Sequence, residues 1–193
     1  MPSVRLLAPL LLAACAASPN RLELPSGPLS LPAPPPSWNA ILAAQADRGV
    51  SGHEDALRSL LEQEDPATRA RACFALGIDH PSAFETLRFL AAEDAEAVVR
   101  AAAVTACARA RAAEAIEVVA AGLNDPSALV RAAAASAAHL LPVGDEAPIE
   151  LDQALVDAAA DDADGEVRWR ALFSLARRGV DHLAVYSKAV LPE

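Results

Sequence analysis

The sequence has few of the residues that give a small protein an affinity for nucleic acids or for charged membranes. Only 4% of its 193 residues are aromatic, and Lys188 is the only lysine among 16 basic residues. Against these stand 26 acidic residues, so the formal net charge is −10. Nucleic-acid binding requires a basic face, and attachment to anionic lipid requires clustered basic residues. We therefore expect no nucleic-acid partner.

The common patterns of catalytic and metal sites are also missing. His53-Glu54 begins like the HExxH zinc motif, but Leu57 stands where the second histidine is needed. Residues 161–166, DDADGE, have the composition of a calcium loop, but alanine occupies its first and twelfth positions. The sequence contains no GxSxG, P-loop or dinucleotide fingerprint. We expect no metal, no cofactor and no catalytic residue, and hence a protein that is not an enzyme.

The N-terminus has a short apolar run. Arg5 precedes apolar residues from Leu6 to Ala14. A membrane-spanning helix needs about 20 residues, so this run is too short to span, but a positive start before a short apolar core is typical of a secretory signal. The run ends in Leu12-Ala13-Ala14-Cys15, which resembles the lipobox of bacterial lipoproteins.

In that family the peptide is cut just before the cysteine, which then carries acyl chains. The resemblance implies a signal peptide over 1–14, lipidation of Cys15, and a place in the bacterial cell envelope facing the periplasm. Two or more acyl chains hold a protein firmly to a membrane. Ala16, in place of an aspartate, favours the outer membrane. An ordinary signal peptide cut after Ala14-Cys15-Ala16, or an apolar start without a targeting role, are the alternatives.

A proline-rich stretch follows the cysteine. Residues 18–37 contain seven prolines and one glycine, a composition that excludes a helix or a central strand. Fully extended at about 3.1 Å per residue, such a stretch reaches up to roughly 60 Å. We expect a tether over 15–37; a proline-rich ligand for a partner domain is the alternative.

The rest of the chain repeats. Four segments have an arginine six residues after an aspartate, usually with valine just before the arginine, and the arginines are 29, 31 and 37 residues apart. The pairs are Asp65 and Arg71, Asp94 and Arg100, Asp125 and Arg131, and Asp162 and Arg168. The longer last step contains an insertion at 142–148. Such a period is typical of a stack of small supersecondary units.

Each unit reads as two amphipathic helices. Apolar residues recur one before and three, four and seven after the arginine, which places them on one face of a helix. In the first unit these residues are Ala70, Phe74, Ala75 and Ile78. A second apolar set at helical spacing precedes each unit, beginning with Ala56, Leu57, Leu60 and Leu61. Gly77 and Gly179 are placed to end helices.

This pattern resembles the short HEAT-like repeats that also occur in phycobilisome lyases. The resemblance implies an all-α, right-handed solenoid of about four helix pairs within 38–193. Residues 38–48, with Trp38, Ile41 and Leu42 on one face, and residues 181–189 could form capping helices at its two ends. The resemblance also implies that the four aspartates and four arginines bond between successive repeats as a structural ladder. We refer to this set as the aspartate–arginine ladder. A ligand-binding role for the arginine row is the alternative.

Two further residue types in the repeats need an interpretation. Cys73 and Cys107 lie two and seven residues after their arginines, about 140° apart around a helix. Since a disulfide needs Cα atoms within about 7 Å, we expect two buried thiols. Trp169 stands where the other units have alanine, which indicates packing at the end of the stack or a ligand-facing aromatic.

A solenoid on a tether with no catalytic constellation favours a membrane-anchored interaction module that binds an unidentified protein through its surface. An accessory to a lyase-like enzyme and a structural spacer of the envelope are the alternatives. A deep polar pocket would favour the enzyme accessory, and a featureless alanine-rich surface would favour the spacer. Exposed aromatic or charged residues on a broad face would favour the interaction module.

Overall fold

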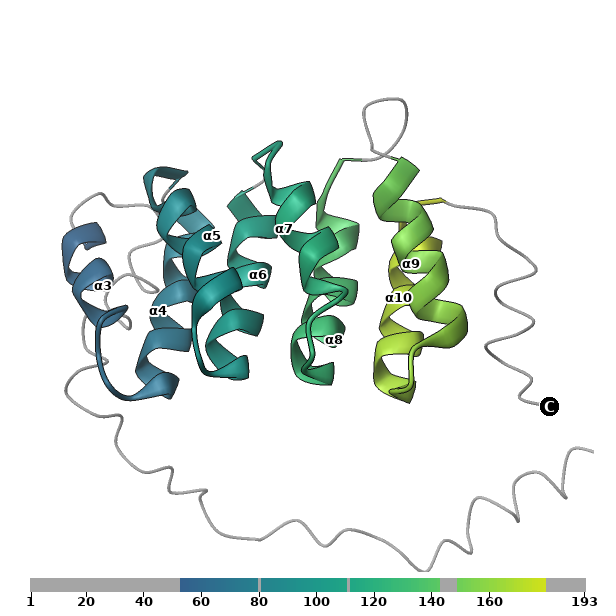
Figure 1. The fold of residues 1–193 in the computed structure, drawn as a ribbon. Coiled ribbons are helices and arrows are strands. Elements are labelled where there is room, and N and C mark those ends of the chain that lie inside the picture. The colour runs from purple at the N-terminus through teal and green to yellow at the C-terminus, as the bar shows by residue number, and fades with distance from the viewer. Residues whose placement is uncertain (1–52, 80, 111, 143–148, 180–193) are drawn as a thin grey trace, which may run out of the picture. The chain divides into compact units, whose positions relative to one another are not determined.

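The computed structural model describes residues 53–79, 81–110, 112–142 and 149–179 (Figure 1). The regions that carry the lipobox, the tether, residues 143–148 of the insertion and both expected capping helices lie outside these residues. Within the described part the secondary structure is entirely helical, as the repeats predict. The helices are α3 (Glu54–Leu60), α4 (Pro66–Asp79), η2 (Pro81–Ala83), α5 (Phe84–Glu93), α6 (Ala97–Ala110), α7 (Ala115–Gly122), α8 (Ala128–Ala137), η3 (Ala138–Leu140), α9 (Ile149–Asp161) and α10 (Gly165–Arg177).

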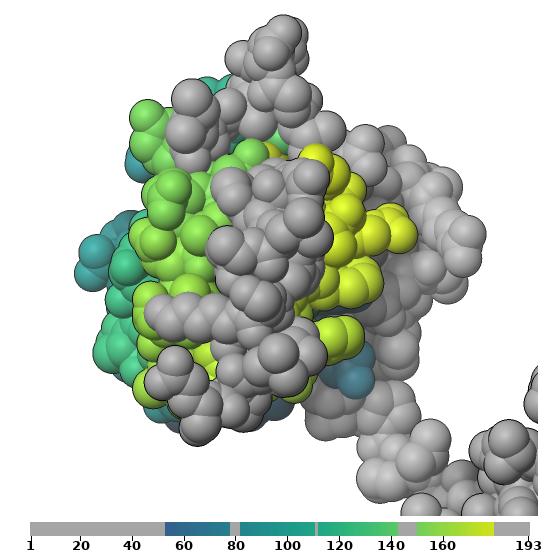
Figure 2. Space-filling model, turned by 90° about the vertical axis from the view of Figure 1, so that its right-hand side faces the viewer, coloured from purple at the N-terminus to yellow at the C-terminus, as the bar shows by residue number. Residues whose placement is uncertain are grey.

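The helices pack as four pairs, which form a solenoid. The first helices of the pairs, α3, α5, α7 and α9, form one row, and the second helices, α4, α6, α8 and α10, form the other (Figure 1). We call these the first-helix row and the second-helix row. Seen from the end of the stack, the light-green surface of α9 and the yellow surface of α10 lie on opposite sides (Figure 2). No helix among the described residues is long and apolar enough to cross a membrane.

The core lies between the two rows. The first helices supply leucines, among them Leu57, Leu87 and Leu151, which are fully buried. The second helices supply valines and alanines, and the valines just before the repeat arginines, at positions 99, 130 and 167, are also fully buried. Each such leucine or valine stabilises the fold by about 1.5–3 kcal/mol. Two of the core predictions are wrong, because Ala56 and Phe74 are exposed.

The small residues of the second-helix row let its helices approach closely. Gly77 lies inside α4 and does not end it, contrary to the prediction. A Cβ atom at this position would be 2.5 Å from the Cα and Cβ atoms of Ala106 on α6, so the glycine is needed for helix contact. Gly179 does end α10: it has a φ of 70°, and its amide donates to the carbonyl of Ala176.

Candidate binding surface

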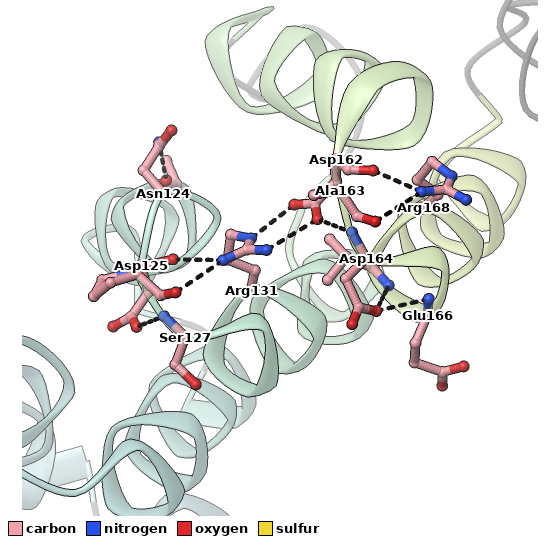
Figure 3. A network of polar contacts seen from close by, with 12 residues as sticks. Asn124, Asp125, Ser127, Arg131, Asp162, Ala163, Asp164, Glu166 and Arg168 are labelled. Atoms are coloured by element: carbon pink, nitrogen blue, oxygen red, sulfur yellow. Dashed lines mark hydrogen bonds and ion pairs between the residues drawn. The ribbon is translucent and has the colours of Figure 1, made fainter.

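An aspartate–arginine ladder joins the repeats at the turns between first and second helices (Figure 3). Arg131 donates from Nε and Nη2 to the two carboxylate oxygens of Asp162, at 2.7 and 3.0 Å. Its third nitrogen, Nη1, donates to the carbonyls of Asp125 and Pro126 in its own repeat. Arg100 makes the same bidentate contact with Asp125, at 2.8 and 3.0 Å. Each arginine therefore fastens its own turn and the turn of the next repeat.

The aspartates of the ladder are held in turn by backbone amides. The carboxylates of Asp94, Asp125 and Asp162 each accept a hydrogen bond from the amide two residues later. Their side chains are only 6–10% exposed in these pairs, and those of the arginines are 13–18% exposed. This arrangement is a partly buried ion-pair network in which both partners have most of their hydrogen-bonding groups satisfied.

The ladder shifts the ionisation of its carboxylates. Hydrogen bonds from Arg100 and Arg131 lower the pKa of Asp125 and of Asp162 against the opposing effect of burial. For Asp94 burial is the largest single influence and raises the pKa, but the hydrogen bonds from Arg69 and from the backbone bring it below the ordinary value. The carboxylates therefore stay charged down to lower pH in the folded protein.

The first ladder arginine is Arg69, and the prediction of Arg71 is wrong. Arg69 donates from Nε and Nη2 to Asp94 at 3.0 and 3.1 Å, and from Nη1 to the carbonyls of Gln63 and Glu64. This geometry repeats that of Arg100 and Arg131, whereas Arg71 is exposed. With Arg69 in place, the ladder arginines are 31, 31 and 37 residues apart.

Asp65 belongs to a different set of residues from the ladder. Its carboxylate accepts hydrogen bonds from the Thr68 hydroxyl at 2.6 Å and from the Thr68 amide at 2.9 Å, and these bonds lower its pKa. It is thus the N-cap of α4. Its counterpart is Asp164, which caps α10 through the amides of Glu166 and Val167.

The last ladder arginine has the same position relative to its own turn. Arg168 donates from Nη1 to the carbonyls of Asp162 and Ala163 at 2.7 and 3.3 Å. Within the described helices no repeat follows it, and no carboxylate there is bonded to it. The ladder predicted from the sequence therefore exists in three complete steps, from Arg69 to Asp94, from Arg100 to Asp125 and from Arg131 to Asp162.

Arg178 is a structural arginine that the sequence pattern did not reveal. Its side chain is 1% exposed and donates to Asp152 at 2.6 Å, and to the carbonyls of Ala138 and Leu141. It ties the end of α10 to α9 and to the end of the third repeat, where the insertion begins. No other repeat has an arginine at the equivalent position, ten residues after its ladder arginine, so the repeat pattern gives no signal for this role.

The exposed aromatic residues lie mostly on the second-helix row. Phe74 is 36% exposed, and the Arg109 guanidinium lies 4.1 Å from the centre of its ring. At the other end of the stack Trp169 is 62% exposed and Phe173 is 44% exposed. The ring of Phe173 meets that of His139 edge to face at 5.6 Å. Trp169 is therefore a surface residue of α10, and no described contact makes it a packing residue.

The first-helix row is grooved and acidic. A groove of about 880 Å³ lies between the turn that follows α7, residues 123–125, and α9, and one of about 420 Å³ lies between α5 and α7. The larger groove is lined by Glu150, Asp157 and Asp161 as well as the ladder residues Asp125 and Asp162. The larger of the two grooves thus lies at the longest spacing between repeats, the 37 residues from Arg131 to Arg168.

The two cysteines of the repeats are buried free thiols, as predicted. Burial raises the pKa of Cys73 and of Cys107 to about 12, so neither is a reactive thiolate at neutral pH. Cys15, the predicted lipidation residue, lies outside the described residues. Among the residues that the structure describes, no three His, Cys, Asp or Glu side chains are grouped so as to hold a metal ion.

Comparison with known proteins agrees with this architecture. A search of curated proteins found no match to the sequence. The sequence model of HEAT repeats matches residues 54–139 and again residues 90–176. These two matches cover the described helices from α3 into α10 and more than half of the chain. The protein therefore belongs to the HEAT-repeat family.

Proposed function

We propose that this protein is a non-catalytic scaffold that binds a partner protein through its helical stack and is held at a membrane of the bacterial cell envelope by lipid on Cys15. The observation that carries the scaffold proposal is the set of exposed aromatic and apolar side chains on helices that are otherwise rich in alanine. A spacer would need no such residues. Aromatic side chains in particular serve as anchors in protein interfaces.

The membrane part of the proposal is supported by the sequence alone. Leu12-Ala13-Ala14-Cys15 resembles a lipobox, and the proline-rich residues 18–37 fit a tether between an anchor and a folded domain. A tether of this kind leaves the whole surface of the stack accessible to a partner. The absence of aspartate at position 16 favours the outer membrane.

Replacing Cys15 by serine tests the anchor. We expect the wild-type chain to incorporate labelled palmitate and to sediment with envelope membranes, and the Cys15→Ser variant to do neither. Cys73→Ser is the matched control, because this thiol is buried in the stack and should have no effect on fractionation. A wild-type chain that is unlabelled, or a Cys15→Ser chain that stays with the membranes, contradicts the anchor.

Photo-crosslinking from the stack in living cells tests the scaffold. A photoreactive amino acid placed at exposed positions of both helix rows should give a specific product with another protein. If none of these positions gives a product and the purified protein turns over a small molecule, the proposal is wrong and an enzymatic or accessory role is favoured. If neither occurs, a spacer is favoured.

A further inference from the structure

The charges of the stack are divided between its two helix rows. The first helices contain nine acidic residues and two arginines, whereas the second helices contain eight arginines and two acidic residues. The acids of the first row are Glu54, Asp55, Glu85, Glu93, Glu117, Glu150, Asp152, Asp157 and Asp161, and the arginines of the second row are Arg69, Arg71, Arg100, Arg109, Arg131, Arg168, Arg170 and Arg177. Within the helix bounds, acidic residues therefore predominate on the first-helix row and arginines on the second, while the aspartates that pair with Arg69, Arg100 and Arg131 lie in the turns between the rows.

Part of the basic charge remains available at the surface. Arg69, Arg100 and Arg131 are committed to the ladder. Arg109 lies over the ring of Phe74, and Arg177 is exposed at the end of α10. The Arg109 guanidinium thus stands beside an aromatic side chain of the second-helix row, and Arg177 follows Phe173 by four residues, about one helical turn, on α10.

The exposed apolar side chains share one side of these helices. Of the six large hydrophobic residues exposed in the described part of the chain, five lie on the second-helix row: Phe74, Val98, Leu129, Trp169 and Phe173. Relative to the ladder arginine of each helix they stand at positions −2, +1 and +5. At 100° per residue these positions fall within about 60° of one another. We call these five residues, with Arg109 and Arg177, the second-row face; Arg170 lies on the same helix but is already paired with Glu166 at 2.7 Å.

We infer that the second-row face binds an acidic, amphipathic helix of the partner protein. This inference rests on the proposed scaffold function and adds the location of the site and the chemistry of the partner. Apolar side chains of the helix would contact Leu129 and the aromatic residues at the two ends of the stack, and its carboxylates would pair with the arginines. Carboxylates meet arginine in bidentate geometry, which gives such pairs strength and direction.

The acidic side of the stack does not prevent this encounter. The first helices lie behind the second helices by about one helix diameter, roughly 10 Å. The Debye length is about 8 Å at physiological ionic strength, so the field of the first row is largely screened at the second-row face, while the arginines there contact the partner directly. Local charge complementarity therefore outweighs the unfavourable net charge.

The spacing of the two aromatic ends sets the length of the partner. Phe74 on α4 and Trp169 on α10 are separated by three helix-to-helix steps of about 8–10 Å, or roughly 25–30 Å in total. A helix rises about 1.5 Å per residue, so about 18 residues cover this distance. A shorter segment would reach only one of the two ends and should bind more weakly.

Three synthetic 18-residue peptides test the inference against the full-length protein. The first has a leucine and phenylalanine stripe with glutamate on the opposite side, the second has lysine in place of glutamate, and the third has the composition of the first without the stripe. We expect the glutamate peptide to bind at least tenfold more tightly than the other two, and more weakly as salt rises. Its binding should shift the backbone amide signals of α4, α6, α8 and α10. Equal or tighter binding of the lysine peptide, or amide shifts confined to the first-helix row, overturns the inference.

Matched variants separate the two rows. Arg109→Glu with Arg177→Glu, and separately Leu129→Ser with Trp169→Ser, should each weaken binding of the glutamate peptide at least tenfold. Arg88→Glu and Phe89→Ser on α5 are the controls, since Arg88 is 55% and Phe89 is 64% exposed on the other row, and they should change binding less than twofold. Unchanged thermal unfolding confirms that each variant is folded. Loss of binding in the control variants contradicts the inference. So does self-association of the wild-type chain that is absent in Phe89→Ser, because it would show that the first-helix row is the binding face.

Crosslinking in cells distinguishes failure of this inference from failure of the scaffold proposal. A photoreactive residue at position 129 reports on the second-row face, and one at position 89 reports on the first-helix row. A product at 129 that maps to an acidic segment of another protein supports the inference. A product only at 89 retains the scaffold and overturns the assigned face, and a product at 129 with nucleic acid overturns the assigned partner. No product at either position, with peptide binding also absent, removes both proposals.

Discussion

The two helix rows differ in the side chains that they use and in how closely their helices pack. The second-helix row is built from alanine, valine and glycine, and its helices approach until Gly77 meets Ala106. The first-helix row places leucines in the core but leaves grooves between its neighbouring helices. Close contacts within the second-helix row thus set the distance between repeats, whereas the first-helix row accommodates different distances through its grooves. Substitutions that change stability and substitutions that change the surface should therefore fall on different helices of this stack.

Adding a methyl group to the glycines of the two rows should give the largest contrast. In Gly77→Ala the new Cβ atom would lie 2.5 Å from the backbone of Ala106, so α4 and α6 must separate, at a cost of about 3 kcal/mol. In Gly122→Ala, on the first-helix row, the nearest atom is the Ala134 Cβ at 3.0 Å, and the better helix propensity of alanine offsets part of the strain by about 1 kcal/mol.

Urea unfolding measures both variants. Gly165→Ala is the control, since its nearest neighbour is the flexible end of Arg168 at 3.5 Å, and it should be neutral within about 0.5 kcal/mol. Because the atoms nearest Gly122 belong to Ala134 and Val104 of the second-helix row, an equal loss of stability in the two variants would show that α7 packs against the second-helix row as tightly as α4 packs against α6.

Arginine substitutions should give the next largest contrast. Arg69→Gln removes a bidentate contact with Asp94, which is 6% exposed, and leaves that carboxylate without its partner. The expected loss is roughly 2–3 kcal/mol, between the values for exposed and buried ion pairs. Arg71→Gln should cost under about 1 kcal/mol, because Arg71 is exposed.

Arg88→Gln extends this comparison to the first-helix row. Arg88 and its partner Glu85 are 55% and 72% exposed, so the loss in unfolding free energy should be below about 0.5 kcal/mol. If Arg71→Gln proves more costly than Arg69→Gln, the register of the first repeat is the one that the sequence motif suggested.

Acid should reveal the smallest effect, which is the pH dependence of a single ladder step. The pKa of Asp125 is lowered on folding by Arg100, so this carboxylate contributes its full stability above the pKa of unfolded aspartate, about 3.9. The contribution is lost as pH falls through the lower folded value. Wild-type protein should therefore lose more unfolding free energy between pH 5 and pH 3 than Asp125→Asn does. Equal losses in the two proteins would contradict a lowered pKa.

Much of this architecture could be predicted from the sequence because each repeat depends on short-range patterns. Apolar residues at helical spacing identify the helix pairs, and the valine before each arginine marks the side that faces the core. Three ladder steps need only an aspartate and an arginine in each turn. Arg100, Arg131 and their partners were therefore predictable without coordinates.

The first repeat was misread because two arginines stand close together and only Asp65 precedes them at the expected distance. The geometry selects Arg69, whose own turn contributes backbone carbonyls and requires no aspartate at position 63. In the later repeats the aspartate at this position binds the arginine of the repeat before it. No described repeat precedes this turn, so position 63 needs no carboxylate. Two sequence signals could have corrected it: the equal spacing of 31 residues, and the apolar Ala72, Cys73 and Leu76 at three, four and seven residues after Arg69.

The role of Gly77 could not be predicted because a glycine that ends a helix and one that permits close helix contact look alike in sequence. The charge of the two rows was likewise readable only once the helices were assigned to rows. Arg178 was missed because its partner Asp152 and the carbonyls of Ala138 and Leu141 come together only through the packing of three separate segments.

The first two steps of the ladder have the same length in sequence, whereas the third, from Arg131 to Asp162, spans 31 residues because it contains the insertion. Arg69 bonds to Asp94 and Arg100 to Asp125 across the same 25 residues. Deleting residues 70–100 would bring Asp125 to that same separation from Arg69, and the second helix would continue through 101–110 without a change of face. Removing one residue more or fewer would rotate that helix by about 100° and turn its apolar side away from the core. The stack can be shortened or extended in whole repeats, as a chain of interchangeable modules, but not by fractions of one.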